Sequence, residues 1–238
     1  MDIAAVIPVR KGSVRLKNKN GLPFGDQDSL IAWKINQLKQ VLPPERIYLS
    51  TEAEDYKDIG RQLGVQIHNR EPRLADESMS PFADVLFGVV SDIEHEYIAW
   101  CPVTSPLMSP TDYHQAFAVY ESEVINGSHD SVMGVMLLKE YLWSEEKSLN
   151  YEASDQHVYS QGLPNIYQVT NSIHIRDREA ILRDHYHTGS NPYKLPLSKL
   201  AGVDIDYPED YEMAVALYSL YCKKYMGKLQ NRVLLLYE

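Results

Sequence analysis

The expected fold depends on two adjoining stretches near the start of the sequence: IAAVIPV at residues 3–9 and RKGSVRLKNKN at residues 10–20. The first is a continuous apolar run, which is typical of a parallel strand buried on both faces. The second carries five Lys or Arg side chains and a Gly-Ser pair. Ligands of open α/β sheets bind just beyond the carboxyl ends of such strands. The order of the two stretches therefore predicts a ligand-binding loop at the edge of a sheet.

The charge of this loop is opposite to that of the whole chain. The 238 residues include 33 Asp and Glu but only 23 Lys and Arg, and no acid occurs between Asp2 and Asp26. A local positive field in a chain of net charge −10 favours a small polyanion such as a nucleoside triphosphate. The overall acidity argues against nucleic acid or an anionic membrane surface as the partner. The alternative is a solvated basic loop.

The glycines of the loop do not fit the common phosphate-binding motifs. Gly12 lets backbone amides approach an anion, and Ser13 and Asn20 add uncharged donors. Because Gly21 is followed by Leu22, the spacing matches neither GxxxxGK[ST] nor GxGxxG. The motif spacing therefore argues against P-loop and dinucleotide-binding interpretations.

Strand-like and helix-like patterns alternate through the first half of the chain. Apolar runs are found at 3–9, 46–50, 65–68, 97–101 and 131–135. Between them, apolar side chains recur at helical spacing in 30–41, 54–63, 82–93 and 111–123. This alternation predicts a three-layer, Rossmann-like α/β fold with a mostly parallel sheet. The length is that of one substantial core, so we expect a single domain over residues 1–238.

The alternation breaks between about residues 139 and 167, where polar residues surround Trp143 without a clear period. We interpret this segment as an inserted excursion. The pattern predicts further elements beyond it: a strand at 167–176, a short helix at 178–183 and a longer helix at 208–224. The final apolar run, 233–237, is expected to pack against the rest of the chain.

Cysteine content and hydropathy suggest a location. Cys101 and Cys222 are too few and too far apart for a disulfide framework or a zinc site, so we expect buried thiols in a reducing compartment. No run approaches the ~18 apolar residues of a membrane span. We therefore expect a cytoplasmic protein with no membrane partner.

Two aspartates late in the chain suggest a metal site. In VDID at 203–206 both acids lie on the same side of an extended segment, because strand side chains alternate with period two. Mg²⁺ commonly takes one or two protein carboxylates plus substrate phosphates. The alternative is that Asp206 or Tyr207 caps the following helix, while the next two acids complement its dipole. That alternative explains less about Asp204, which precedes the helix.

Three further groups of residues are candidates for the site or for a structural role. Thr104 and Ser105 follow the fourth apolar run, at the expected ligand edge, although a plain turn is the alternative. Arg70 follows the third run, and its planar fork can hold a base edge or a phosphate. His185 and His187 have no metal-ligand spacing with other residues and are interpreted as surface or structural side chains.

Several stretches match a set of known motifs in the same order along the chain. Residues 7–20 are similar to IPARGGSKRIPGKN. Shorter matches follow at 49–51 to VSTD, at 70–75 to RPxxLA, at 104–107 to PTSPL and at 204–210 to DIDTPED. Together they resemble the acylneuraminate cytidylyltransferase, or CMP-sialic acid synthetase, family. The resemblance spans about residues 3 to 218.

The resemblance implies roles for individual residues. The residues implied to bind CTP are Arg10, Ser13, Arg15, Lys19, Asn20, Arg70 and Ser80. Those implied in catalysis are Arg10, Lys19 and Asp206, and Mg²⁺ is expected at Asp204 and Asp206. The sugar is expected near Thr104, Ser105 and Gln161. The implied fold is that of nucleotide-diphospho-sugar transferases, with the excursion at about 139–167 serving for homodimer formation.

The implied reaction joins CTP to a 2-keto-3-deoxy sugar acid of the sialic, legionaminic or pseudaminic type, giving a CMP-sugar and pyrophosphate. Where the family usually has Gln-Pro, this chain has Pro102-Val103, and the family's NGAIYI stretch is replaced at 170–175. These departures leave the acceptor open, including a Kdo-like acid or a phosphonate. The basic loop and the acidic pair would also suit a metal-dependent glycosyltransferase with an Asp-x-Asp site, or a nucleotide-binding regulator without turnover.

Overall fold

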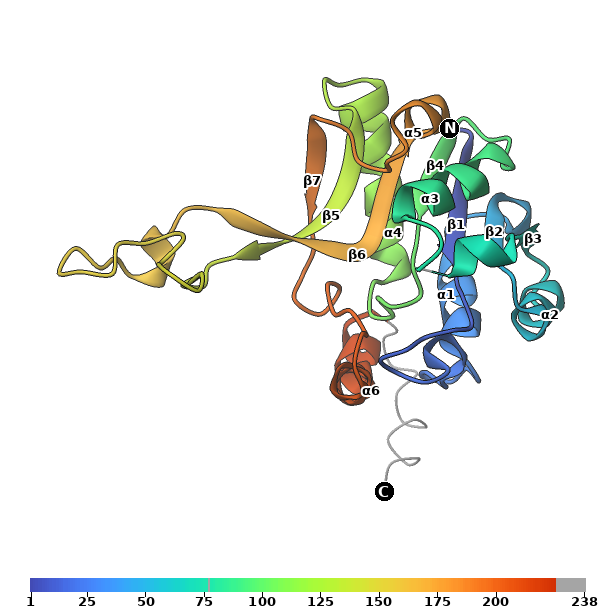
Figure 1. Ribbon diagram of the computed structural model, residues 1–238, viewed down its shortest axis with the longest axis horizontal. Coiled ribbons are helices and arrows are strands. Elements are labelled where there is room, and N and C mark those ends of the chain that lie inside the picture. The colour runs from blue at the N-terminus through green and yellow to red at the C-terminus, as the bar shows by residue number, and fades with distance from the viewer. Residues whose placement is uncertain (77, 226–238) are drawn as a thin grey trace.

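The computed structural model describes residues 1–76 and 78–225, where one seven-stranded sheet lies between helices (Figure 1). The strands are β1 Ile3–Pro8, β2 Ile47–Thr51, β3 Gln66–Asn69, β4 Tyr97–Trp100, β5 Ser131–Leu138, β6 Ile166–Asp177 and β7 Pro192–Pro196. The α-helices are α1 Leu30–Leu38, α2 Glu54–Gln62, α3 Phe82–Ser91, α4 Pro110–Val119, α5 Arg178–Asp184 and α6 Pro208–Tyr225. The apolar run expected to pack, 233–237, lies outside the described residues.

Most strand pairings are parallel, and the strand order is β3-β2-β1-β4-β6-β5-β7. β1 pairs in parallel with β2 and β4, β2 with β3, and β5 with β7. Only β6, among the strands of the described chain, runs antiparallel to its neighbours β4 and β5. The predicted three-layer, mostly parallel α/β fold is confirmed.

β1 is buried on both faces, as its continuous apolar run requires. Ala4 and Val6 belong to a cluster with buried residues of α3 and α5, whereas Ile7 belongs to the larger cluster with α1 and α4. Side chains alternate between the two faces of a strand, so a polar residue on either face of β1 would enter a core. The packing fixes the end of β1, and with it the start of the basic loop.

Two helices differ most from the predicted ones at their C-terminal ends. α1 ends at Leu38 rather than at residue 41, because the backbone N–H groups of Val41 and Leu42 both donate to the Leu38 carbonyl and close a turn. The helix predicted to reach residue 123 is regular only to Val119 and continues as a π-helix over Tyr120–Ile125.

The edge strand β7 was not predicted. Pro192 and Pro196 stand at its two ends. Proline has no N–H group to donate to a neighbouring strand, so it argues against a strand in a sequence pattern. β7 pairs on one side only, with β5, where such residues are tolerated.

β5 and β6 continue away from the sheet as a projecting arm, residues 135–169, which extends to the left in Figure 1. The pairing shifts register between Met133 and Val135 and then runs from Val135 opposite Val169 to Leu138 opposite Ile166. A register shift of this kind bends a strand and increases its twist. The excursion inferred from the sequence forms the outer part of this arm.

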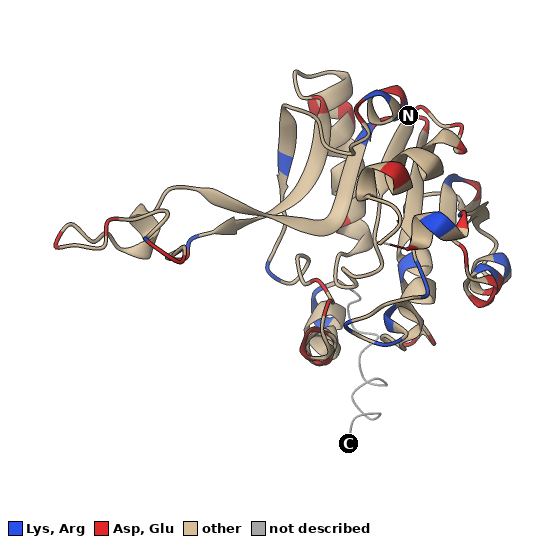
Figure 2. Cartoon of the chain, in the orientation of Figure 1, with Lys and Arg blue, Asp and Glu red and all other residues tan. Residues whose placement is uncertain are grey.

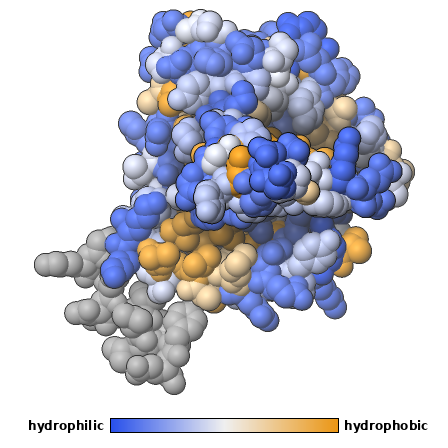
Figure 3. All heavy atoms as spheres, turned by 90° about the vertical axis from the view of Figure 1, so that its left-hand side faces the viewer, coloured by the Kyte–Doolittle hydropathy of each residue, from blue (hydrophilic) through white to orange (hydrophobic). Residues whose placement is uncertain are grey.

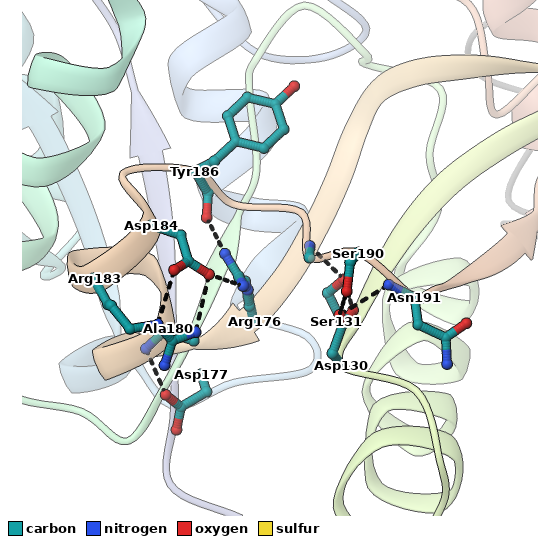
Figure 4. Close-up of polar contacts among 11 residues, drawn as sticks. Asp130, Ser131, Arg176, Asp177, Ala180, Arg183, Asp184, Tyr186, Ser190 and Asn191 are labelled. Atoms are coloured by element: carbon teal, nitrogen blue, oxygen red, sulfur yellow. Dashed lines mark hydrogen bonds and ion pairs between the residues drawn. The ribbon is translucent and has the colours of Figure 1, made fainter.

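The loop between α5 and β7 is fixed by polar contacts to β5 and β6 (Figure 4). Arg176 of β6 donates to the Tyr186 carbonyl at 2.8 Å and pairs with Asp184. At the other end of the loop, Asp130 accepts a hydrogen bond from the backbone N–H of Asn191 at 2.9 Å. These contacts hold the loop that carries His187.

Two of the buried histidines, His174 and His187, are structural. The rings of His174 and His187 stack with centroids 3.8 Å apart, and a nitrogen of each lies within 3.1 Å of Thr188 Oγ1. Burial lowers the pKa of His174 to about 4. Burial, together with the charges of His174 and Arg176, lowers the pKa of His187 to about 2. The structural interpretation of His187 from the sequence is confirmed.

We expect His187→Gln to make folding stability less sensitive to acid. Because the folded-state pKa is depressed, the unfolded chain binds the proton first, so this stability is present above pH 6.5 and is lost as the pH falls below it. Between pH 7 and pH 5 the loss for such a histidine is about 2 kcal/mol. Urea unfolding at both pH values measures it, with exposed His114→Gln as the control. Equal losses in wild type and His187→Gln would contradict the assignment.

Candidate active site

The basic loop, residues 10–20, is folded by its own amide side chains. Asn18 adopts a left-handed conformation with φ 55°, and its Oδ1 accepts a hydrogen bond from the Tyr56 hydroxyl at 2.9 Å. Asn20 is buried and donates to the Arg10 carbonyl at 2.9 Å. The two asparagines therefore shape the turn, and Lys19 between them points out of it toward another segment.

The basic loop meets the late aspartate pair, although the two are far apart in sequence. Lys19 Nζ donates to the Ile205 carbonyl at 2.8 Å, across 186 residues, and lies 3.1 Å from Asp206 Oδ1. Arg15 pairs with the same carboxylate oxygen at 2.8 Å. Figure 2 shows basic residues of this loop and acidic residues of α6 at the same end of the molecule. The fold therefore brings the basic loop and the acidic segment at residues 204–206 together.

The two aspartates have different surroundings. Asp204 Oδ2 accepts from Asn171 Nδ2 at 2.9 Å, whereas Asp204 Oδ1 is buried and has no hydrogen-bond partner. A buried carboxylate oxygen without a partner costs free energy, and a bound cation would satisfy it. The backbone N–H groups of Asp206 and Tyr207 donate to Asp210 Oδ2, so Asp210 supplies the helix-start contact. The side chain of Asp206 instead faces the basic loop.

Thr104 and Ser105 lie beside the aspartate pair. The Thr104 carbonyl accepts from the Ile205 N–H at 2.8 Å, which joins the loop after β4 to the acidic segment. Ser105 is fully buried, and its Oγ has no hydrogen-bond partner. From α1, Trp33 and Gln37 both donate to the Pro106 carbonyl, in the part of the loop that follows Ser105.

Arg70 and Arg10 form a second cationic group at the carboxyl ends of β1 to β3. Arg70 is buried and donates to the Ser50 carbonyl at 3.0 Å, while Arg10 donates to the Gly12 carbonyl at 2.7 Å. Burial lowers the pKa of Arg70 to about 10, which the charge of Glu52 opposes and the charge of Arg10 reinforces. A guanidinium that is costly to bury gains from an anionic ligand.

Ser80 and Ser13 are two further residues expected to bind CTP. Ser80 is buried, and its N–H donates to the carbonyl of Asp76. Hydrogen bonds from Ser78, and further the charge of Arg10, lower the pKa of Asp76, so this segment lies within the field of Arg10. Ser13 is half-buried in the basic loop.

Gln161 is not brought to the other site residues within one chain. It is exposed on a short turn at Ser160–Gly162 in the arm, which projects away from the basic loop (Figure 1).

Lys34 of α1 was missed by the sequence analysis. It has no exposed surface, and its Nζ donates to the Ser105 carbonyl at 2.8 Å and to the Tyr113 hydroxyl at 2.5 Å. Burial lowers the pKa of Lys34 to about 7, although the charges of Cys101 and Asp204 raise it. The available signal was a lysine in the apolar stretch LIAWKI at 30–35.

A separate cavity of about 240 Å³ lies between α1, α4 and α6, and none of the expected CTP-binding residues lines it. Among residues 1–76 and 78–225, no group of three or more His, Cys, Asp or Glu side chains is arranged to hold a metal ion. No helix in that part of the chain has the length and apolar character needed to cross a membrane.

Known proteins are similar to this chain over nearly its whole length. Residues 4–238 match a protein-family model described as cytidylyltransferase. The chain is 26% identical over 216 residues to an N-acylneuraminate cytidylyltransferase of Streptococcus agalactiae, covering 89% of this chain and 52% of that protein. It is 26% identical over 234 residues to a CMP-N,N'-diacetyllegionaminic acid synthase of Legionella pneumophila, covering 92% and 97% respectively.

The fold is similar to that of a CMP:2-keto-3-deoxy-manno-octonic acid synthetase complexed with CTP, with a TM-score of 0.65, 13% identity, and coverage of 92% of this chain and 99% of that one. The chain spans about half the length of the N-acylneuraminate cytidylyltransferases it matches. Because the family model covers nearly the whole sequence, the chain belongs to the cytidylyltransferase family, and N-acylneuraminate cytidylyltransferases are among its relatives.

Proposed function

We propose that this protein transfers CMP from CTP to a 2-keto-3-deoxy sugar acid of the nonulosonic type and releases pyrophosphate. The observation that carries the proposal is the contact of Lys19 and Arg15 with Asp206. It places the side chains proposed to bind the triphosphate next to a carboxylate proposed to bind the cation. The names of the sequence relatives support this acceptor class. Since the reaction consumes a nucleoside triphosphate, we propose a cytoplasmic location.

The proposed reaction is a displacement at phosphorus. The anomeric hydroxyl oxygen of the sugar acid bonds to the α-phosphorus of CTP, the bond from that phosphorus to the β-phosphate oxygen breaks, and pyrophosphate leaves. The hydroxyl proton passes to solvent. Phosphoryl-type transfer depends mainly on positioning and charge neutralisation, and in our proposal Arg10 and Lys19 neutralise the departing pyrophosphate. Arg70 and Ser80 would hold the cytosine end.

Asp204 and Asp206 fit a magnesium site in this proposal. The unpartnered Oδ1 of Asp204 is the supporting observation, and both carboxylates are oxygen donors of the kind that Mg²⁺ prefers. The ion would supply further positive charge against the phosphates when bound. On binding of CTP, Lys19 and Arg15 would exchange part of their contact with Asp206 for phosphate oxygens.

The rival activities differ in what they consume. A cytidylyltransferase for a Kdo-like acid or a phosphonate would release pyrophosphate from CTP with another acceptor. A glycosyltransferase would consume a nucleotide-sugar, and a regulator would bind CTP without turnover. A pyrophosphate-release assay over the four ribonucleoside triphosphates and a panel of 2-keto sugar acids separates them. The proposal requires release that depends on both CTP and a nonulosonic acid.

We further propose that the arm serves a homodimer. Its side chains Trp143, Leu149 and Tyr159 are 56%, 60% and 85% exposed, which is unusual for large apolar groups on one element. Figure 3 views the molecule from the side of the arm and shows an apolar area below it. Because Gln161 lies on the arm, a second copy would bring it toward the sugar beside Thr104 and Ser105.

We expect Lys19→Met and Asp206→Asn each to lower turnover about 100-fold or more, because each removes a preorganised charge from the transition state. Steady-state pyrophosphate release measures the effect. Lys17→Met is the matched control, since Lys17 lies exposed in the same loop with the same charge. Turnover within threefold of wild type in Lys19→Met or Asp206→Asn would refute the site.

The double variant Trp143→Glu/Tyr159→Glu should be monomeric, because two charges would have to be desolvated in the interface. Analytical ultracentrifugation measures the mass, and circular dichroism checks the fold. Ile125→Glu, an exposed apolar position off the arm, is the control and should keep the wild-type mass. A wild-type chain that is monomeric at micromolar concentration would end the dimer proposal.

A further inference from the structure

The ammonium group of Lys34 is buried behind the candidate site and does not form part of the surface of that site. Of its two hydrogen bonds, one goes to the backbone of the loop after β4, at Ser105, and one to the Tyr113 hydroxyl of α4. The same ammonium lies 5.0 Å from the centroid of the Tyr113 ring. Lys34 therefore joins α1, α4 and the loop at a single buried point.

Two hydrogen bonds connect this point to the aspartate pair. Lys34 holds the Ser105 carbonyl, and the neighbouring Thr104 carbonyl accepts from the N–H of Ile205, which stands between Asp204 and Asp206. The two segments joined in this way carry the buried, unpartnered oxygens Ser105 Oγ and Asp204 Oδ1. These two side-chain oxygens therefore belong to segments whose backbone is held in place through Lys34.

Packing alone does not explain why a charged lysine occupies this buried position. A methionine side chain is similar in length and would fill the same space without the cost of desolvating a charge. What methionine lacks is the N–H donors that reach the Ser105 carbonyl and the Tyr113 hydroxyl. The distinctive contribution of Lys34 is therefore the fixed position of the loop backbone.

We propose that Lys34 is a positioning residue for the cation site: it holds Thr104 and Ser105 against Ile205, and so keeps Asp204 and Asp206 in the arrangement that binds a divalent ion. This inference rests on the magnesium site of the proposed function. Lys34 makes no contact with substrate in this proposal. The effect passes through the loop backbone.

Charge and position make opposite predictions for Lys34→Met. The charges of Lys34 and Asp204 attract each other, so loss of the ammonium alone would leave the aspartates more negative and strengthen cation binding. Loss of the backbone contact would let the aspartates move and weaken cation binding. Removal of residues that orient metal ligands typically costs 10- to 100-fold in metal affinity.

The test is an electron paramagnetic resonance titration of the full-length protein with MnCl₂, which reports free Mn²⁺ directly and needs no turnover. We expect Lys34→Met to weaken Mn²⁺ binding about tenfold or more. Because this variant leaves the Tyr113 hydroxyl buried without its donor, its Tm should also fall. Lys34→Met/Tyr113→Phe should recover much of the Tm but not the Mn²⁺ affinity, since only the loop contact stays missing.

Gln37→Met is the matched control. Gln37 lies one turn from Lys34 on α1 and donates to the carbonyls of Pro106 and Met108, in the part of the loop that has no bond to Ile205. It should change Mn²⁺ affinity less than twofold. Affinity that is unchanged or tighter in Lys34→Met and in the double variant would overturn the inference, as would recovery of affinity together with Tm.

The outcomes also separate this inference from the proposed function. If the wild type binds Mn²⁺ and Lys34→Met does not, but CTP and nonulosonic acids give no pyrophosphate, the activity is wrong and the role of Lys34 stands. If the wild type binds no Mn²⁺ up to millimolar concentrations, there is no cation site to position, and the inference is overturned.

Discussion

The candidate site depends on the attraction between the basic loop after β1 and the carboxylate of Asp206. Lys19 and Arg15 reach this one carboxylate from a segment nearly the whole chain away, and Lys19 also binds the Ile205 carbonyl. The contact is possible because β1 is a buried interior strand of the sheet, and its packing fixes the start of the basic loop. In a chain with ten more acids than bases, it gathers cations where an anionic ligand can use them.

The ion pair of Arg15 with Asp206 contributes little to stability. The side chains of Arg15 and Asp206 are 51% and 35% exposed, and partly exposed pairs are worth at most about 1 kcal/mol. The same exposure leaves Arg15 able to exchange a carboxylate for a phosphate. The rigid part lies behind them, in the buried hydrogen bonds of Asn20, Thr104 and Lys34. The site therefore combines replaceable charges with a fixed backbone.

The sequence was most informative where one local pattern determined one outcome. The apolar run at 3–9 predicted a strand buried on both faces, and the alternation of strand-like and helix-like stretches predicted the mostly parallel sheet. The role of Lys34 was not predicted, because it depends on loops that fold against α1 from distant parts of the chain. The strand β7 was not predicted, because its two prolines resemble turn signals. The pattern could not place Gln161, since the direction of the arm depends on a register shift within β5 and β6.

In our proposal the basic loop and the aspartate pair together hold one metal-bound triphosphate. The most direct measurement is a crystal structure with CTP and MnCl₂, in which anomalous scattering locates the metal. We expect a manganese peak at the carboxylates of Asp204 and Asp206, with the triphosphate lying along residues 10–20. A metal peak or a triphosphate bound elsewhere, with Lys19 still paired to Asp206, would contradict it.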